Sequence, residues 1–475
     1  MRAMRAAGLG MAMGYAAAAG ASNDGGPLRD RSWGAVPADN GLAYIKFDVG
    51  GSLSDRANVA ALQPDGKLLL GGYVNTSTIN SDGALARLLP ANGALDLGFG
   101  TSGRQRLGST TSDGVTDLAI LPDGRIAYAT VLSSTTFAIG RLLADGTPDT
   151  TFDLDGRRAL AASAFVPLGT ILYPPRIAVQ PDGKIVVFAG AGRSSPDIQV
   201  YAVATRLNTD GTTDTTFGGQ GTGYGNYAPI NGASAVALAT AAVRMADGRF
   251  MVGGFAYRAG GSGYDLMVFR LSANGVLDST YGTAGFGFAA FDQGSELNDL
   301  LTALAIDSSG RAVIIGDITD INDRARMGMA RLTATGQTDT TFGTGGRVLW
   351  EVRAAAVWEY GKSVAVLPDG RILVAGTSAL CACGGQGDAG TLTQFASNGQ
   401  INRFFGVNGT ERLGADPGPD AQILPVARMF VSGDYAYLTG WANSPMGAAN
   451  NQEFASARVI VPLFRGGFDV ASPAP

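Results

Sequence analysis

The sequence predicts an all-β protein, a single seven-bladed β-propeller built from four-stranded antiparallel blades. Three observations lead to this prediction. One phrase built around a tight turn recurs seven times, its copies lie 58 to 65 residues apart, and 70 of the 475 residues are Gly while only 16% are charged. A repeat of this length, with apolar stretches on both sides of a turn, is typical of propeller blades. Because each blade packs only on its neighbours, so long a chain needs no single large core.

The recurring phrase joins the first two predicted strands of each blade. Its copies are LQPDGKLLLGG (62–72), LPDGRIAYA (121–129), QPDGKIVVFAG (180–190), MADGRFMVGG (245–254), DSSGRAVIIG (307–316), LPDGRILVAG (367–376) and VSGDYAYLTG (431–440). In most copies an Asp-Gly pair stands between alternating apolar residues, which is a strong signal for a β-hairpin. We therefore expect a type I′ turn at each Asp-Gly pair.

The sixth copy shows the four strands of one blade. SVAVLPDG (363–370) and RILVAGTS (371–378) form the first hairpin, and a variable Gly-rich loop follows them. TLTQFASNG (391–399) is a third strand that ends in a second tight turn, and GTERLGAD (409–416) is a short fourth strand. Four antiparallel strands in about 60 residues make one propeller blade.

A second phrase recurs after the third strand of each blade. It appears as LDLGFG (95–100), PDTTFD (148–153), TDTTFG (213–218), LDSTYG (277–282), TDTTFG (338–343) and INRFFG (401–406). Its acidic residues could serve as calcium ligands or catalytic carboxylates, but an Asp at such a turn also accepts local backbone N–H groups. Since one active site does not need so many copies, we interpret these residues as structural, with the aromatic residue filling the seam between blades.

These phrases resemble a known repeat. QPDGKI, a third strand ending in ATRL, and NTDGTTDTTFGG together are similar to the bacterial delta-60 repeat, and the resemblance extends from residue 41 to about residue 470. It implies a β-propeller of uncharacterised function. A more distant similarity to NHL propellers implies that the strand before each Asp-Gly turn lines the central channel. The last copy departs from the pattern, because its turn is inverted to Gly433-Asp434 and it lacks the second phrase.

The N-terminal part of the repeat region is expected to close the ring. AYIKFDVGGSLSD (43–55) parallels GFAAFDQGSELND (287–299), which contains the fourth strand of an earlier blade. The seventh blade ends after its third strand, at 455–469, so we expect residues 43–49 to supply the missing outer strand. Closure would remove the exposed strand edges that invite aggregation.

The chain is expected to comprise a signal peptide (1–21), a flexible linker (22–40), the propeller (41–470) and a disordered tail (471–475). Two arginines precede an Ala/Gly-rich stretch, and Ala-Gly-Ala at 19–21 is typical of a signal peptidase site. A disordered Ala-rich leader or a wrongly assigned start codon is the alternative. A cleaved leader predicts a secreted, periplasmic or cell-surface protein, and no segment is long enough to span a bilayer.

Composition limits the chemistry and the partners. The net charge is −5 and no run of Lys or Arg occurs, so nucleic acid is not expected as a partner. His is absent, which removes the commonest zinc ligand and the usual general base. Cys381 and Cys383 are the only cysteines, and a strained disulfide, a reduced pair and a metal or redox role all remain open. We expect a monomer without a cofactor, calcium being the one open possibility.

Binding residues are expected on the variable loops between the second and third strands. Loops held by a rigid scaffold are a common place for such residues. The candidates are Tyr73, Arg193, Tyr257, Arg258, Tyr264, Arg324 and Trp441, with Trp358 and Tyr360 on a between-blade loop of the same face. Flat aromatic rings edged by amides and carboxylates suit a polysaccharide, and the alternative is that several of these rings are half-buried at the rim.

One acidic loop, residues 316–326, is the candidate metal site. Its possible calcium ligands are Asp317, Asp320, Asn322 and Asp323. Arg324 and Arg326 lie in the same stretch, so an ion-paired loop without metal is the competing interpretation.

Three functions remain open from the sequence. The first is a non-catalytic exported propeller that binds a polysaccharide or protein at the cell surface. The second is a carbohydrate-active enzyme, a lyase or glycosidase, that uses carboxylates at the mouth of the channel; hydrolysis would need two carboxylates about 5–10 Å apart. The third is an intracellular scaffold for protein partners.

Overall fold

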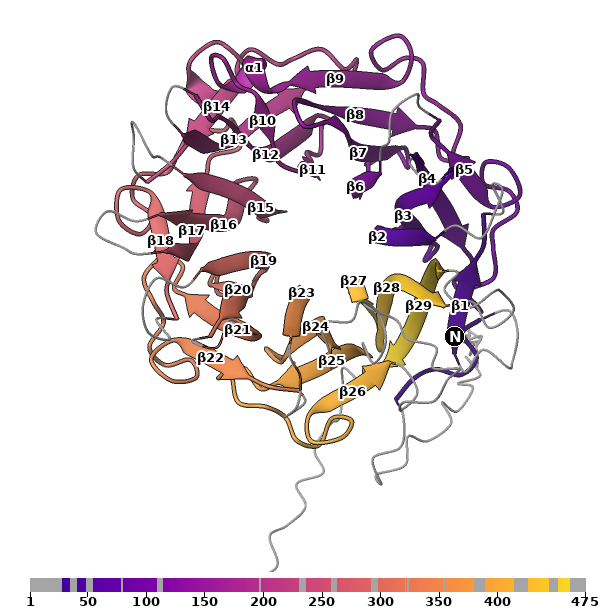
Figure 1. Cartoon of the computed structure of the whole chain (residues 1–475), viewed down its shortest axis with the longest axis vertical. Coiled ribbons are helices and arrows are strands. Elements are labelled where there is room, and N and C mark those ends of the chain that lie inside the picture. Colours follow the sequence, from indigo (N-terminus) through magenta and orange to yellow (C-terminus); the bar gives the residue numbers. More distant parts are fainter. Residues whose placement is uncertain are drawn as a thin grey trace, which may run out of the picture.

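The computed structural model shows seven antiparallel sheets arranged as a ring around a central axis (Figure 1). The structure describes residues 28–34, 41–47, 54–77, 80–108, 114–195, 198–229, 236–257, 263–291, 298–320, 322, 324–352, 356, 358–379, 389–413, 426–443 and 452–461. The predicted seven-bladed propeller with four strands in each blade is confirmed. None of the helices in these residues is long and apolar enough to cross a membrane.

The first three blades follow one another along the chain. Blade one contains β2 (Asp55–Leu62), β3 (Leu68–Asn75), β4 (Ser81–Leu88) and β5 (Arg104–Arg106). Blade two contains β6 (Val115–Ile120), β7 (Ile126–Ser133), β8 (Thr136–Leu142) and β9 (Arg157–Ala161), and the short helix α1 (Ala162–Phe165) follows it. Blade three contains β11 (Arg176–Val179), β12 (Ile185–Arg193), β13 (Gln199–Leu207) and β14 (Tyr224–Tyr227), and β10 (Ile171–Leu172) pairs with the far end of β12.

The other four blades continue the ring. Blade four contains β15 (Ala237–Arg244), β16 (Phe250–Tyr257), β17 (Tyr264–Leu271) and β18 (Phe286–Ala289). Blade five contains β19 (Asp299–Ile306), β20 (Ala312–Thr319), β21 (Ala325–Leu332) and β22 (Arg347–Trp350). Blade six contains β23 (Trp358–Val366), β24 (Ile372–Ala379), β25 (Ala389–Phe395) and β26 (Thr410–Leu413). Blade seven contains β27 (Val426–Ser432), β28 (Tyr435–Asn443), β29 (Gln452–Ile460) and β1 (Leu42–Ile45).

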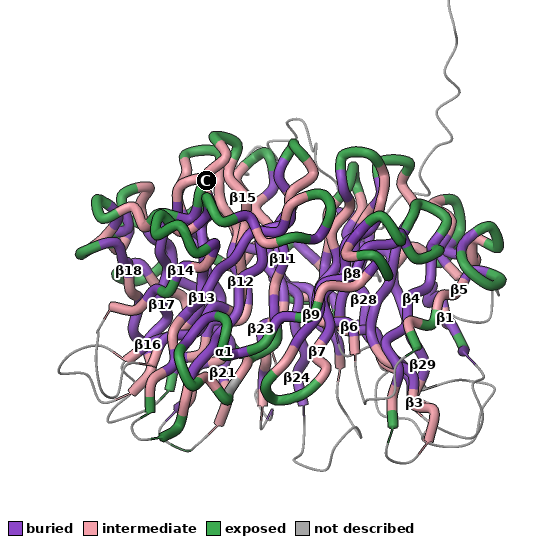
Figure 2. The backbone as a smooth tube through the Cα atoms, turned by 90° about the horizontal axis from the view of Figure 1, so that it is seen from above, coloured by how far each residue is buried: buried purple, intermediate pink, exposed green. Residues whose placement is uncertain are grey.

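The blades present two different faces. The turn face carries the short turns between first and second strands and between third and fourth strands, such as 63–67 and 89–94. The loop face, at the opposite end of the strands, carries the connections between second and third strands and the crossings from blade to blade. In side view the exposed turns line one edge of a wall whose middle is buried (Figure 2). The first strand of each blade lies nearest the axis (Figure 1), as expected.

The turns at the Asp-Gly pairs are not type I′. A type I′ turn needs a positive φ at both central residues. In LPDGR (367–371) Gly370 has φ +87°, whereas Asp369 has no positive φ, and the Gly370 N–H donates to the carbonyl oxygen of Leu367. The chain therefore makes a type I turn followed by a left-handed Gly, and Pro368 has the φ that a type I turn requires at its second position.

The apolar core lies between the blades. Seven clusters of buried side chains each join two neighbouring sheets, so every seam of the ring has its own core. The cluster that joins blade seven to blade one contains Trp33, Leu68 and Phe454, of which none exposes more than 1% of its surface. Stability is therefore shared among seams rather than concentrated in one centre.

The ring closes as the sequence predicts. β1 pairs antiparallel with β29, with Leu42 opposite Ala457 and Ile45 opposite Phe454. The pairing strand ends at Ile45, within the predicted range of 43–49, and residues 48 and 49 lie outside the described part of the chain.

Residues 28–34 lie inside the expected flexible linker, yet they are packed against blade seven. The backbone of Arg29 bridges to Val459, and the Asp30 N–H donates to the carbonyl oxygen of Arg458 at 2.8 Å. Trp33 exposes only 1% of its surface. Burial of this large side chain stabilises the ordered segment together with the backbone hydrogen bonds and the ion pair of Asp30 with Arg458. The predicted leader (1–21) and tail (471–475) lie outside the described residues.

Candidate functional site

The second recurring phrase forms a clamp between blades, which the blade-three copy illustrates. Arg206 on β13 donates from Nε to Asp214 Oδ2 at 2.9 Å, and its guanidinium carbon lies 5.2 Å from the centre of the Phe217 ring. The same Arg206 donates from Nη1 to the carbonyl oxygen of Ala273, in the turn of blade four, at 3.0 Å. One arginine therefore joins its own turn to the next blade.

Most blades repeat this arrangement. The corresponding trios are Arg87–Asp96–Phe99, Arg141–Asp149–Phe152, Arg270–Asp278–Tyr281, Arg331–Asp339–Phe342 and Arg458–Asp30–Trp33. In each trio the arginine also donates to a carbonyl oxygen in the second turn of the following blade: Ala144, Thr209, Ala334, Ser397 and Pro90, respectively. Blade six has a neutral version, in which Asn402 Nδ2 donates to Gln394 Oε1 at 2.6 Å.

The trio of blade seven corrects the expectation that this blade lacks the phrase. Asp30, Ser32, Trp33 and Gly34 supply it from the other end of the repeat region. Asp30 Oδ1 accepts the Ser32 N–H at 2.9 Å, as Asp214 Oδ1 accepts the Thr216 N–H at 3.0 Å in blade three. The phrase RDRSWG was missed because Ser and Trp replace the usual Thr and Phe, and because it lies far from blade seven in the sequence.

The acidic residues of the phrase are structural, as the sequence interpretation holds. Burial alone would raise the pKa of Asp214, but hydrogen bonds from Lys184 and Thr216 and the charge of Arg206 outweigh it and hold the pKa well below its usual range. Asp149 is held low in the same way, against burial, by Thr151, Arg125 and Arg141. A carboxylate that is permanently ionised and surrounded by fixed donors is poorly suited to move protons. The turn face is thus built from repeated structural contacts.

On the loop face, the structure brings two predicted site residues together. The rings of Tyr257 and Tyr264 lie 4.3 Å apart, and Phe255 lies 5.4 Å from Tyr264. Tyr173, which the sequence analysis did not select, completes this tyrosine patch, and its surface is 38% exposed. Burial raises the pKa of Tyr264, and the neighbouring Tyr257 and Tyr173 add to the shift. All four rings of the patch are partly exposed to solvent.

Two other predicted residues make specific contacts at two other seams of the ring. Trp441 on β28 lies under the guanidinium of Arg56, at 4.8 Å from the ring centre, and Arg56 donates to Gln452 Oε1 at 2.6 Å. Tyr360 on β23 lies 4.7 Å from Lys362 Nζ, an ammonium that also lies 3.5 Å from a carboxylate oxygen of Asp317. Aromatic rings in such cation–π pairs are held in fixed orientations.

The remaining predicted binding residues are spread around the loop face. Tyr73 lies near the end of β3 against Gly114, Arg193 ends β12, and Trp358 begins β23 and is half-buried. They come from blades one, three and six. Arg258 lies outside the described residues.

The candidate metal loop is dominated by ion pairs. Asp320 Oδ2 accepts from Arg324 Nε at 2.9 Å and lies 3.5 Å from Arg326 Nε, while the N–H groups of Asn322 and Arg324 donate to Oδ1. Asp317 faces Lys362 of blade six instead. Among the residues that the structure describes, no three His, Cys, Asp or Glu side chains lie close enough to hold a metal ion. Asp323, Cys381 and Cys383 lie outside those residues.

Asp317 is the described loop-face carboxylate with the most unusual environment. Burial raises its pKa to about 6, although the charge of Lys362 and the Gly361 N–H, which donates to Oδ1 at 3.1 Å, oppose the shift. A carboxyl group that titrates near neutrality is a candidate acid or base. Its contacts with Gly361 and Lys362 place it in the seam with blade six.

Two arginines near the axis were not selected by the sequence analysis. Arg176 on β11 donates from Nη1 to the carbonyl oxygen of Thr116 at 2.6 Å and from Nε to that of Thr240 at 2.9 Å. Arg428 on β27 places Nη2 at 3.6 Å from Asp117 Oδ1. These residues belong to the innermost strands of blades three and seven, so their charges lie beside the axis of the ring (Figure 1).

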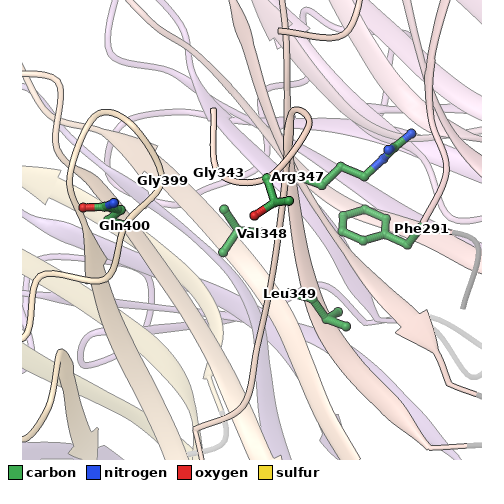
Figure 3. A pocket seen from close by; sticks show the side chains of 8 residues that line it. Phe291, Gly343, Arg347, Val348, Leu349, Gly399 and Gln400 are labelled. Carbon is green, nitrogen blue, oxygen red and sulfur yellow. The ribbon is translucent and has the colours of Figure 1, made fainter. Parts of the chain in front are cut away.

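A hollow of about 500 Å³ lies at the outer edge of the ring, between blades five and six (Figure 3). Arg347, Val348 and Leu349 of β22 line it together with Phe291 and with Gly399 and Gln400 of the next blade's second turn. Its described lining has one charged side chain, Arg347, and no acidic one. Catalytic side chains are therefore not gathered there.

Five segments of the chain match a known family of repeats. Residues 63–99, 121–152, 180–217, 246–281 and 308–342 match the family described as "Domain of unknown function (DUF5122) beta-propeller". The match supports a propeller repeat family of unknown function. None of the curated proteins matches it in sequence.

Several solved structures are similar to the chain at low identity. The polysaccharide lyase Uly1 is 12% identical, with 87% of this chain and 91% of that chain covered and a TM-score of 0.49. Drosophila Semaphorin 2a is 8% identical, with 87% and 74% covered and a TM-score of 0.47. A PL25 ulvan lyase is 10% identical, with 89% and 94% covered and a TM-score of 0.45. Likenesses this distant carry no conclusion about activity.

Proposed function

We propose that the chain is a non-catalytic, exported β-propeller module that binds a polysaccharide on its loop face. The tyrosine patch of Tyr173, Phe255, Tyr257 and Tyr264 is the observation that carries this proposal. Its rings come from two neighbouring blades, they are partly exposed, and they do not belong to the repeated clamp. Flat amphipathic rings offer large contact areas to sugar rings at little cost in conformational entropy.

The engagement of the carboxylates favours binding over catalysis. Among the described loop-face acids, Asp320 is paired with two arginines, Asp117 accepts the Ile177 N–H at 2.9 Å, and Asp82 is paired with Arg106. Asp317, the candidate acid or base, accepts the Gly361 N–H and lies 3.5 Å from Lys362 Nζ. A glycosidase needs two carboxylates facing each other across the scissile bond. Export rests on the leader predicted from residues 1–21, and the propeller family itself has no known function.

The test is a carbohydrate-array screen of the purified chain, with and without calcium, followed by titration calorimetry on each hit. Tyr173→Ala and Tyr264→Ala are expected to weaken binding about tenfold or more, as truncation of a central aromatic contact commonly does. Phe404→Ala is the matched control, since Phe404 is an aromatic residue of the turn face with 99% of its surface exposed.

Three outcomes would contradict the proposal. Released oligosaccharide in the product analysis would identify an enzyme instead. Binding that Phe404→Ala weakens as much as Tyr264→Ala would place the site on the turn face. A wild-type chain that binds no glycan, with or without calcium, would remove the polysaccharide as ligand.

A further inference from the structure

One position of the innermost strands differs in charge from blade to blade. Six of these strands carry a one-residue bulge, and the residue after each bulge faces the second strand of its own blade. Arg176 takes the same place in blade three, opposite Phe188, the fourth residue of β12. The seven residues at this position are Val59, Asp117, Arg176, Ala241, Ala303, Ser363 and Arg428. Only three of them are charged, so the repeat architecture itself does not require charge there.

Arg176 is held in place and still has unused donors. Its bonds to the carbonyl oxygens of Thr116 in blade two and Thr240 in blade four fix the guanidinium between two neighbouring inner strands. A guanidinium has five N–H groups. Within the described part of the chain the other donors of Arg176 have no hydrogen-bond partner. A preorganised guanidinium of this kind loses little entropy when it binds an anion.

Arg428 adds a second guanidinium, and within the described residues Asp117 is the carboxylate that interacts with the pair. Arg428 Nη2 lies 3.6 Å from Asp117 Oδ1, and 29% of the Arg428 side chain is exposed. Asp117 Oδ2 is occupied by the Ile177 N–H at 2.9 Å. Burial lowers the pKa of Arg176, the charge of Asp117 opposes this shift and the charge of Arg428 adds to it, which places all three groups in one electrostatic cluster. The cluster therefore has an excess of positive charge.

We propose that Arg176 and Arg428 form an anion site at the axis, which takes the carboxylate or sulfate group of an acidic polysaccharide. Two guanidiniums with free N–H groups suit an anion that has two or more oxygens, because such pairs bind in a bidentate manner. Tyr173 of the tyrosine patch precedes Arg176 by three residues, so their Cα atoms lie at most about 11 Å apart. This inference rests on the proposed function, in which the rings of the tyrosine patch stack on a sugar ring. The two arginines then bind the anionic group that the sugar carries.

The experiment compares acidic saccharides with their neutral counterparts by titration calorimetry. The ligands are oligogalacturonate and its methyl ester, sulfated and unsulfated galactan oligosaccharides, and sodium sulfate alone. The variants are Arg428→Gln and the matched control Arg403→Gln, because Arg403 is an exposed arginine of the turn face. Melting temperatures verify that both variants fold; Arg428 has one ion pair, at 3.6 Å, so its replacement should leave the fold intact.

We expect the wild-type chain and Arg403→Gln to bind the acidic saccharides at least about tenfold more tightly than the neutral ones, with an affinity that falls as salt is added. Arg428→Gln should lose that preference while it keeps its affinity for the neutral forms. Equal binding of acidic and neutral forms by the wild type would overturn the anion site and leave the proposed function standing.

Binding of no saccharide would defeat the proposed function. If sulfate alone still binds the wild type and Arg403→Gln, and Arg428→Gln loses it, the site stands as a receptor for a free anion. If sulfate also fails to bind, the site is refuted together with the function.

Discussion

Replacing Trp33 with Ala should destabilise the whole ring, because this side chain joins the two ends of the repeat region. Trp33 is 1% exposed and lies between Tyr437, at 5.5 Å between ring centres, and Arg458, whose guanidinium carbon is 4.7 Å from the indole. It also covers Gly93 in the second turn of blade one, where an added Cβ would lie 2.8 Å from the indole. One residue thus contacts blade seven and blade one.

The expected loss follows from these contacts. Truncation of a buried Phe or Trp to Ala costs about 3–5 kcal/mol of unfolding free energy. The lost cation–π contact with Arg458 accounts for about 0.5–2 kcal/mol of such a loss. We therefore expect the free energy of unfolding to fall by about 4 kcal/mol. At about 2.1 cal/mol/K of unfolding entropy per residue, a chain of 475 residues loses about 4 °C of melting temperature if it unfolds in one transition.

Differential scanning calorimetry of three variants measures this effect. Phe342→Ala removes the corresponding ring from the clamp of blade five, where the chain is continuous, and Phe404→Ala removes a ring that is 99% exposed. Trp33→Ala should lower the melting temperature at least as much as Phe342→Ala, whereas Phe404→Ala should stay within about 0.5 kcal/mol of the wild type. If Trp33→Ala melts like the wild type while Phe342→Ala does not, the N-terminal segment takes no part in closing the ring.

Two further predictions concern the clamp and the seam between blades five and six. Gly146→Ala and Gly124→Ala both place a Cβ at a positive φ (+90° and +85°), but only the Cβ at position 146 meets a side chain, Phe99 at 2.6 Å. In chemical denaturation, Gly146→Ala should therefore lose about 1–3 kcal/mol more unfolding free energy than Gly124→Ala. Equal losses would show that packing of the Phe99 ring does not depend on this turn. The raised pKa of Asp317, about 6 against an ordinary 3.8, means that the folded chain gains stability from this group at low pH and loses it as the pH rises through about 6. At pH 8 the unfolding free energy of Asp317→Asn should therefore exceed that of the wild type by about 2–3 kcal/mol. Near pH 4 the variant and the wild type should be equally stable. A variant that is less stable than the wild type at pH 8 would show that the pair with Lys362 outweighs the cost of burial.

The fold was predictable because its determinants are local and repeated. The alternating strands, the Gly at each first turn and the spacing of the copies are all visible in the sequence, and the similarity of 43–55 to 287–299 revealed the strand exchange. The turn type was not predictable from the Asp-Gly pair alone, since Asp-Gly also occurs in type I′ turns. In the Asp369-Gly370 pair, only Gly370 has a positive φ.

The clamp of blade seven and the axial arginines were harder to find, for different reasons. The first is divided between Asp30–Gly34 and Arg458, so no continuous segment shows it. Arg428 aligns with Arg176 only when the bulge before Arg428 is counted, and a bulge shifts the alternation that sequence reasoning follows. Their shared electrostatic environment depends on strands that lie in different blades. Which inner-strand side chains approach one another across the axis is decided only when the ring closes.

The overall charge of the chain misleads about the charge at its axis. A net charge of −5 argues against anionic partners only if charges are evenly spread. In this protein the turn-face carboxylates are taken up by the clamps, as Asp214 is by Arg206 and Lys184, and the acid of the candidate metal loop, Asp320, by Arg324 and Arg326. Arg176 and Arg428 share one carboxylate, so an anionic group is attracted to the axis of an acidic protein. This remains different from a nucleic-acid surface, which needs a row of cations spaced along phosphates rather than one pair.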